Sequence, residues 1–197
     1  TVDAYVFVEV TDTTQGLGEY SIADGWAKLD GFDNVYYREV AEDANPKEFS
    51  VLAGDKVSYS AALENSDMLD TDGNLKSGIE LTFKAHAILK EGFDSAVAAY
   101  KQIPTEATTT DEVTEAIANG KAVKLADNAT DVTVPVEKLT DKNVSIDLNN
   151  KVLTVTGQNS VVSDGESLTL ENGTVKWNVT NRVALSMDTG SDVTLKN

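Results

Sequence analysis

Cysteine is absent from the sequence, and His86 is the only histidine. The first absence excludes disulfide bonds and thiolate chemistry. Protein zinc sites are usually built from several His and Cys side chains, so a single histidine argues against such a site. It also argues against Ser-His-Asp and Cys-His catalysis. We therefore expect a protein that is not an enzyme.

Basic residues are also few. The chain has 16 lysines and arginines against 33 aspartates and glutamates, which gives a net charge of −17. Phosphate groups are bound by basic patches, so this balance argues against nucleic acid and anionic membranes as partners. No apolar run approaches the roughly 20 residues of a membrane span. Thr, Asn, Asp, Val and Gly give the composition typical of bacterial surface proteins, so we expect a secreted or cell-wall-associated protein.

A short pattern occurs three times in the last third of the chain: an alternating apolar strand that runs into an Asn-rich turn. The copies lie at residues 146–150, 168–173 and 193–197. Asn and Gly tolerate positive φ, so the chain can turn sharply after each strand. Leu170 follows Leu148 by 22 residues and Leu195 follows Leu170 by 25, which is typical of stacked repeats. The pattern predicts a right-handed parallel β-helix with these three leucines over one another, continuing beyond Asn197.

The first ninety residues contain strand patterns separated by turns and no helix pattern. Strands are predicted at 2–10, 35–40, 48–52, 57–63 and 79–87. The first is apolar on both faces, so we expect it inside a sheet. Its neighbour would come from later in the chain, from residues upstream, or from another molecule. These strands predict an antiparallel jelly-roll-like β-sandwich, followed by a short helix at 93–100.

A polar, Thr-rich stretch begins at Pro104 and divides the chain. We predict a sandwich in residues 1–103, a linker in 104–110, and a helix-capped parallel β-helix in 111–197. The fold class is therefore all-β, with one short capping helix.

The capping helix is predicted at about 111–118. Thr109 and Glu112 have the spacing of a capping box, and Asn119-Gly120 supplies a stop. Its apolar side would cover the first coil, where stacking leaves strand edges open. That side carries Val113, Ala116 and Ile117.

Four oxygen-bearing side chains crowd one loop of the first half. They are Asp67, Asp70, Asp72 and Asn74. Their alternate spacing suits calcium, which would be the one cofactor. The EF-hand pattern, however, requires Gly at its sixth position and Glu at its twelfth, where Leu75 and Leu81 stand. The loop is therefore either a calcium site or a solvated acidic hairpin loop.

A polysaccharide-binding or polysaccharide-lyase function is the alternative. Parallel β-helices often display carboxylates and a basic residue along one groove, and aromatic rings stack on sugars. The groove candidates are Asp147, Asp164, Glu171, Lys176 and Arg182. Asp147 and Glu171 lie near the turns of successive repeats, which would let them stack within reach of one another. The aromatic candidates are Trp26, Tyr36, Tyr37 and Trp177. Turn chemistry for the first set and core packing for the second are the competing interpretations.

The first half resembles a known family. The segments TVDAYVFVEV, DGWAKLDG, VYYREV, FSVLAGDKVSYSAAL and IELTFKAHAILKEGFDSAVAAY are similar to the TasA/camelysin family, over roughly residues 1–103. This resemblance implies a jelly-roll-like sandwich released by a SipW-type signal peptidase and, in some members, assembly into matrix fibres. Camelysin-type members are classed as metallopeptidases, but no HExxH motif occurs in this sequence. His86 alternates with Glu80, Thr82 and Lys84 on the polar face of the predicted strand, so we expect a surface histidine. The second half resembles the Thr- and Asn-rich β-helices of large bacterial surface proteins.

Together these features predict an extracellular structural or adhesive bacterial surface protein, such as a fibre, biofilm-matrix or stalk component. The expected partners are other copies of the chain or related surface proteins, and glycans. If the first strand lacks a partner within the chain on one side, a strand from another molecule would fill that gap by donor-strand addition. Neither nucleic acid nor a membrane span is expected.

Overall fold

The structure is a computed structural model, and it describes residues 3–45, 47–59, 63–74, 76, 78–140, 143–158, 160–163, 165–180 and 185–196. Strands hold 41% of the residues and helices 15%, so the fold class is all-β. The sheets formed by these residues are not closed. The chain forms two compact units, Thr1–Ala99 and Tyr100–Asn197, divided within helix α2 (Ala96–Gln102) rather than after residue 103. Within the described ranges, every helix lacks the length and apolar character needed to cross a membrane.

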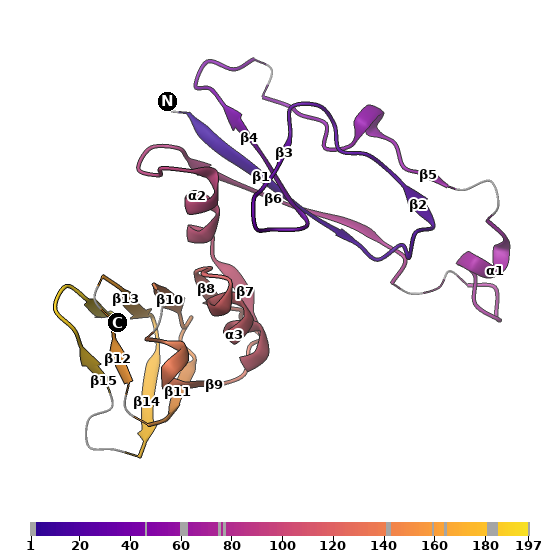
Figure 1. The fold of residues 1–197 in the computed structure, drawn as a ribbon. Helices are drawn as coiled ribbons and strands as arrows, with labels where there is room; N and C mark the ends of the chain where they lie inside the picture. Colours follow the sequence, from indigo (N-terminus) through magenta and orange to yellow (C-terminus); the bar gives the residue numbers. More distant parts are fainter. Residues whose placement is uncertain are drawn as a thin grey trace. The chain divides into compact units, whose positions relative to one another are not determined.

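An antiparallel sheet with the strand order β3–β4–β1–β6 organises the first unit (Figure 1). Its strands are β1 (Ala4–Asp12), β3 (Ala27–Lys28), β4 (Val35–Val40) and β6 (Leu81–Leu89). As predicted, β1 is an inner strand, and Phe7 and Val8 are buried on its opposite faces. Of the three sources considered for its neighbour, later parts of the chain supply both, β4 on one edge and β6 on the other. The condition for donor-strand addition at β1 is therefore not met, because both of its edges are already paired.

The rest of the first unit has less regular structure than predicted. A second sheet pairs only β2 (Gly18–Glu19) with β5 (Ser58–Tyr59), and residues 60–62 of the predicted strand lie outside the described residues. The predicted strand at 48–52 is a single bridge from Leu52 to Ile22, because the chain then turns through Gly54 at φ +65°. Two short helices, η1 (Ala53–Asp55) and α1 (Asn65–Met68), lie in the region expected to be helix-free.

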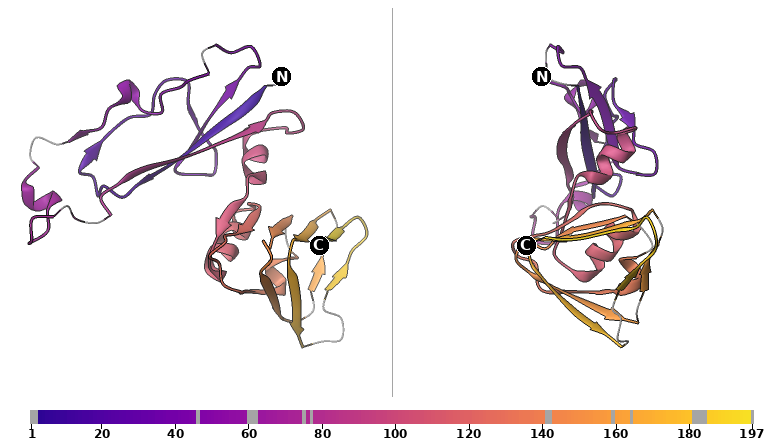
Figure 2. Two further views of the ribbon diagram at one scale, coloured as in Figure 1. Left: turned by 180° about the vertical axis from the view of Figure 1, so that it is seen from behind. Right: turned by 90° about the vertical axis from the view of Figure 1, so that its left-hand side faces the viewer.

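The second unit contains three parallel sheets around a shared interior (Figure 2, right). The first sheet has the order β16–β13–β10–β8–β7, with β7 (Thr105–Ala107), β8 (Val123–Leu125), β10 (Val144–Asp147), β13 (Ser167–Glu171) and β16 (Asp192–Lys196). The second has the order β14–β11–β9, with β9 (Val132–Pro135), β11 (Val152–Gly157) and β14 (Thr174–Val179). The third pairs β12 (Ser160–Val162) with β15 (Leu185–Met187). One passage of the chain through these sheets is called a coil below.

The register of the first sheet corrects the predicted stack of leucines. Val123, Ile146, Leu170 and Leu195 lie opposite one another, and successive members are 23, 24 and 25 residues apart. Leu148 is not in this ladder, so its predicted place over Leu170 is wrong. The turn after β10 consists of residues 148–151, whereas the turn after β13 consists of residues 172–173 only. Leu148 therefore belongs to the longer turn.

Apolar side chains from all three sheets form one core. In the second sheet Leu153 lies between Val132 and Val175, and Val155 lies between Val134 and Trp177. Leu153 and Val155 are fully buried. Full burial of such a side chain contributes about 1.5–3 kcal/mol, so each added row stabilises the stack.

Helix α3 (Thr110–Ala118) confirms the predicted capping helix. Thr109 accepts a hydrogen bond from the Glu112 amide and the Glu112 carboxylate accepts one from the Thr109 amide. Val113, Ala116 and Ile117 are buried against β7, β8, β9 and η2 (Val136–Lys138).

The expected linker at 104–110 is instead part of the second unit. It contains β7, which pairs in parallel with β8, and the start of α3. Pairing with β7 gives the outer edge of β8 its ladder partners, which a solvated linker would leave unpaired.

Candidate functional site

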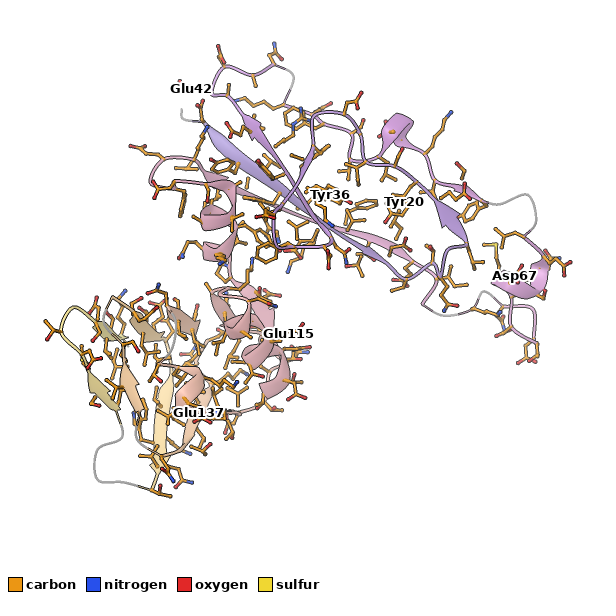
Figure 3. All side chains as sticks on the ribbon, viewed as in Figure 1. Tyr20, Tyr36, Glu42, Asp67, Glu115 and Glu137 are labelled. Atoms are coloured by element: carbon orange, nitrogen blue, oxygen red, sulfur yellow. The ribbon has the colours of Figure 1, made fainter. Side chains whose placement is uncertain are left out.

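The acidic loop uses its carboxylates to fold its own backbone. Asp67 lies on α1 (Figure 3), and its Oδ2 accepts a hydrogen bond from the Glu64 amide at 2.9 Å. Asp70 Oδ1 accepts from the amides of Asn74 and Asp72 at 2.8 and 3.0 Å. These hydrogen bonds, that of Asn74 first, hold the pKa of Asp70 below its ordinary value. These carboxylates therefore close turns of the loop's own backbone.

The acidic loop is the predicted calcium site. Within the part of the chain that the structure describes, no three His, Cys, Asp or Glu side chains are gathered so that they could hold a metal ion. Leu75 of the EF-hand comparison lies outside the described residues. Calcium binding by Asp67, Asp70, Asp72 and Asn74 stays a prediction.

The asparagine turns of the second unit have the predicted left-handed backbone. Asn149, Asn150 and Asn172 have φ values of +46°, +63° and +56°. The Asn149 side chain donates to the Leu125 carbonyl at 2.9 Å and to Asp127 Oδ1 at 2.9 Å. Each of these partners belongs to the preceding coil, so the side-chain amide ties one coil to the next.

Two of the lyase candidates are neighbours, as the repeat predicts. Asp147 on β10 is directly opposite Glu171 on β13. Asp147 Oδ1 accepts hydrogen bonds from the Asn149 amide at 3.0 Å and from Asn172 Nδ2 at 3.1 Å, so it serves the turns. Glu171 Oε2 lies 3.8 Å from Lys196 Nζ on the next coil. Lys176 lies in the β14 sheet and not beside this pair, and the candidates Asp164 and Arg182 lie outside the described residues.

The aromatic candidates pack within the protein. Trp26 Nε1 donates to the Ser50 carbonyl at 2.9 Å, and the Arg38 guanidinium lies 5.4 Å from the Trp26 ring and 3.8 Å from the Phe49 ring. Such cation–π contacts engage the ring faces that a sugar would need.

Two tyrosines and the second tryptophan follow the same pattern. Tyr37 contacts Tyr5 and Phe7, with ring centroids 6.2 Å apart in both pairs. Tyr36 is half-buried on β4 (Figure 3), and Trp177 packs against the core of the second unit. Core packing is the better interpretation for these rings.

His86 is less exposed than predicted. It lies opposite the fully buried Phe7, and its Nε2 is 3.3 Å from Glu9 Oε1. The histidine side chain is 19% exposed and that of Glu9 is 30% exposed. The residue therefore belongs to a half-buried polar pair within the sheet.

An exposed apolar row on β6 is the surface that sequence reasoning missed. Leu81, Phe83, Ala85, Ala87 and Leu89 share one face of β6, and we call them the β6 stripe. Phe83 is 41% exposed and Leu89 55%, and Ala85 and Ala87 are also exposed. The residues opposite Phe83 and Ala85 on the same face are Val10 and Val8 of β1, which are buried. The covered core thus ends at β1, and the same face of β6 is open to solvent.

Comparison of the chain with protein-family models, with curated proteins and with solved structures found no match. The resemblance to the TasA/camelysin family therefore depends on the sequence segments alone.

Proposed function

We propose that this protein is an extracellular structural or adhesive component of a bacterial surface, with its second unit acting as a stiff spacer built as a right-handed parallel β-helix. The in-register ladder of Val123, Ile146, Leu170 and Leu195 carries this proposal. Each coil adds ladder hydrogen bonds and a row of buried apolar side chains to its neighbour. Stability then depends mainly on contacts between adjacent coils, as in other stacked repeats.

The first unit is proposed as a jelly-roll-like sandwich of the TasA/camelysin kind that joins copies of the chain. Its antiparallel sheet around β1 and the separate β2–β5 pair support this assignment. Because β4 and β6 flank β1, a strand from another molecule would have to add at an edge of this sheet. The two edge strands are β3, with two residues, and β6, with nine, so β6 is the better site. A net charge of −17 suits a solvated extracellular protein.

A polysaccharide lyase remains the second candidate because Asp147 and Glu171 are neighbours on one outward row. A non-catalytic role is favoured because Asp147 already accepts two hydrogen bonds from turn groups and Glu171 faces Lys196. General acid–base catalysis requires a carboxylate within hydrogen-bonding reach of the substrate proton.

Two measurements test the proposal. Fractionation of the native bacterium should place the protein outside the cell or in the wall, and a cytosolic protein would contradict the proposed role. Incubation with acidic and neutral polysaccharides plus calcium should release no unsaturated products. Product formation that disappears in Asp147→Asn but persists in Asp192→Asn, an exposed carboxylate of β16, would favour the lyase instead.

A further inference from the structure

We infer that two copies of this chain pair edge to edge through β6, antiparallel, about a two-fold axis at Ala85. This inference rests on the proposed association between copies and names its surface. β6 ends the sheet order β3–β4–β1–β6, and among the described residues only β1 pairs with it. A nine-residue edge strand with an exposed apolar face is a template for another strand.

The backbone of β6 fits its own copy. The Lys90 amide donates to the Asp3 carbonyl, and the Thr13 amide donates to the Glu80 carbonyl. Hydrogen-bonded pairs alternate along an antiparallel ladder, so the even-numbered residues of β6 direct their N–H and C=O groups at β1. The odd-numbered residues, from Leu81 to Leu89, direct theirs at the open edge. A two-fold axis at Ala85 sets odd residues opposite odd residues, so each free donor meets a free acceptor.

The side chains fit under the same symmetry. Leu81 lies opposite Leu89 of the second copy, Phe83 opposite Ala87, and Ala85 opposite Ala85. All belong to the β6 stripe, so the two exposed rows become one continuous apolar surface on one face of an extended sheet. Phe83 meets a small residue, which leaves room for its ring. Apolar cross-strand pairs are the units that stabilise a sheet.

Other registers are worse. Moving the axis to residue 84 sets Lys84 against Lys84 of the second copy, and like charges directly opposite are destabilising. Moving it to His86 shortens the overlap and breaks the Leu81–Leu89 pair. Axes between residues set odd against even positions, where the backbone groups point away from each other. The pairing at Ala85 uses the full strand, and because the contact is the same on both copies it closes as a dimer.

The full chain should therefore dimerise as its concentration rises in analytical ultracentrifugation. Added salt should favour the dimer, because each copy carries a net charge of −17 and salt screens the repulsion. Ala85→Lys places two like charges at the axis and should raise the dimer dissociation constant about fivefold. Ala85→Thr, a neutral residue that suits strands, should keep the dimer. Equal dissociation constants for the two variants would overturn the inference, and so would a monomer at every concentration.

A cross-link locates the contact. The chain has no cysteine, so Ala85→Cys introduces a unique thiol at the axis, where paired Cα atoms are about 5.5 Å apart. Tyr59→Cys, at a 58% exposed position of the same unit, is the control. Mild oxidation should link Ala85→Cys at least tenfold faster. Equal rates of cross-linking would contradict pairing through β6. They would do so even if a dimer forms through a donor strand or through another surface. The fractionation and polysaccharide assays do not depend on the β6 contact. They therefore test the proposed function independently of this inference.

Discussion

Replacing Leu170 by alanine should destabilise the second unit far more than replacing Leu195, although the two residues occupy the same position in adjacent coils. They lie directly opposite each other in the β13–β16 register. Leu170 is 2% exposed because coils lie on both sides of it, whereas Leu195 is 60% exposed. The two leucines have the same residue type and the same position in their strands, but they differ in burial. A difference between their alanine variants therefore reports the burial that stacking provides.

The expected magnitudes follow from these exposures. A Leu→Ala change in a closed core costs about 2–5 kcal/mol, since a cavity adds to the lost transfer free energy. At Leu195 less than half of the side chain is covered, so the cost should be roughly 1 kcal/mol. With a urea slope of about 1–3 kcal/mol per molar, the two unfolding midpoints should differ by on the order of 1 M.

Urea unfolding followed by tryptophan fluorescence measures this difference. Trp177 packs against the core of the second unit, so a Trp26→Phe background makes the signal specific for that unit. If Leu170→Ala does not fold, Leu170→Val and Leu195→Val give the same comparison at lower cost. Equal losses at the two positions, with unchanged slopes, would refute the stacked ladder as the source of stability.

Three further predictions concern the turn and the cap. Gly173→Ala should destabilise the second unit by about 1–3 kcal/mol in the same urea assay, because its Cβ would lie 2.5 Å from Leu148 Cβ. An unchanged midpoint would contradict this close contact. Thr109→Ala should cost about 1 kcal/mol through loss of the N-cap, measured by urea unfolding against Thr114→Ala as a control. Hydrogen bonds from the Thr108 amide, the Thr108 hydroxyl and the Thr109 amide lower the pKa of Glu112 from its ordinary 4.5. Its contribution should thus be complete above about pH 4.5 and be lost as pH falls through the lowered value. Glu112→Gln should reduce stability at pH 7 and remove this acid dependence, and a variant with an unchanged pH profile would contradict the assignment.

Local sequence patterns predicted much of the fold. The two apolar faces of β1 identified an inner strand, and Thr109 with Glu112 identified the start of α3. Both features depend on neighbours within a few residues. The asparagine turns were likewise predictable, because a left-handed backbone restricts the residue type at one position.

The register between strands and the contacts of individual side chains were not predictable in the same way. Leu148 and Ile146 are both apolar and two residues apart, so alternation alone does not say which one stacks under Leu170. Two extra residues in the turn after β10 decided it. The neighbouring carboxylates Asp147 and Glu171 were predictable as a pair, but their use by turn amides and Lys196 needed the structure.

The sequence by itself determined which side chains share a face, since that depends only on the two-residue period of a strand. The predicted strand at 79–87 thereby placed Leu81, Phe83, Ala85 and Ala87 on one face, whereas Leu89 lies beyond its predicted end. Only the tertiary structure decided that Val8 and Val10 are covered while the stripe beside them is open. The physical reason is that burial depends on segments distant in the chain, and alternation looks the same whether or not another layer packs on it.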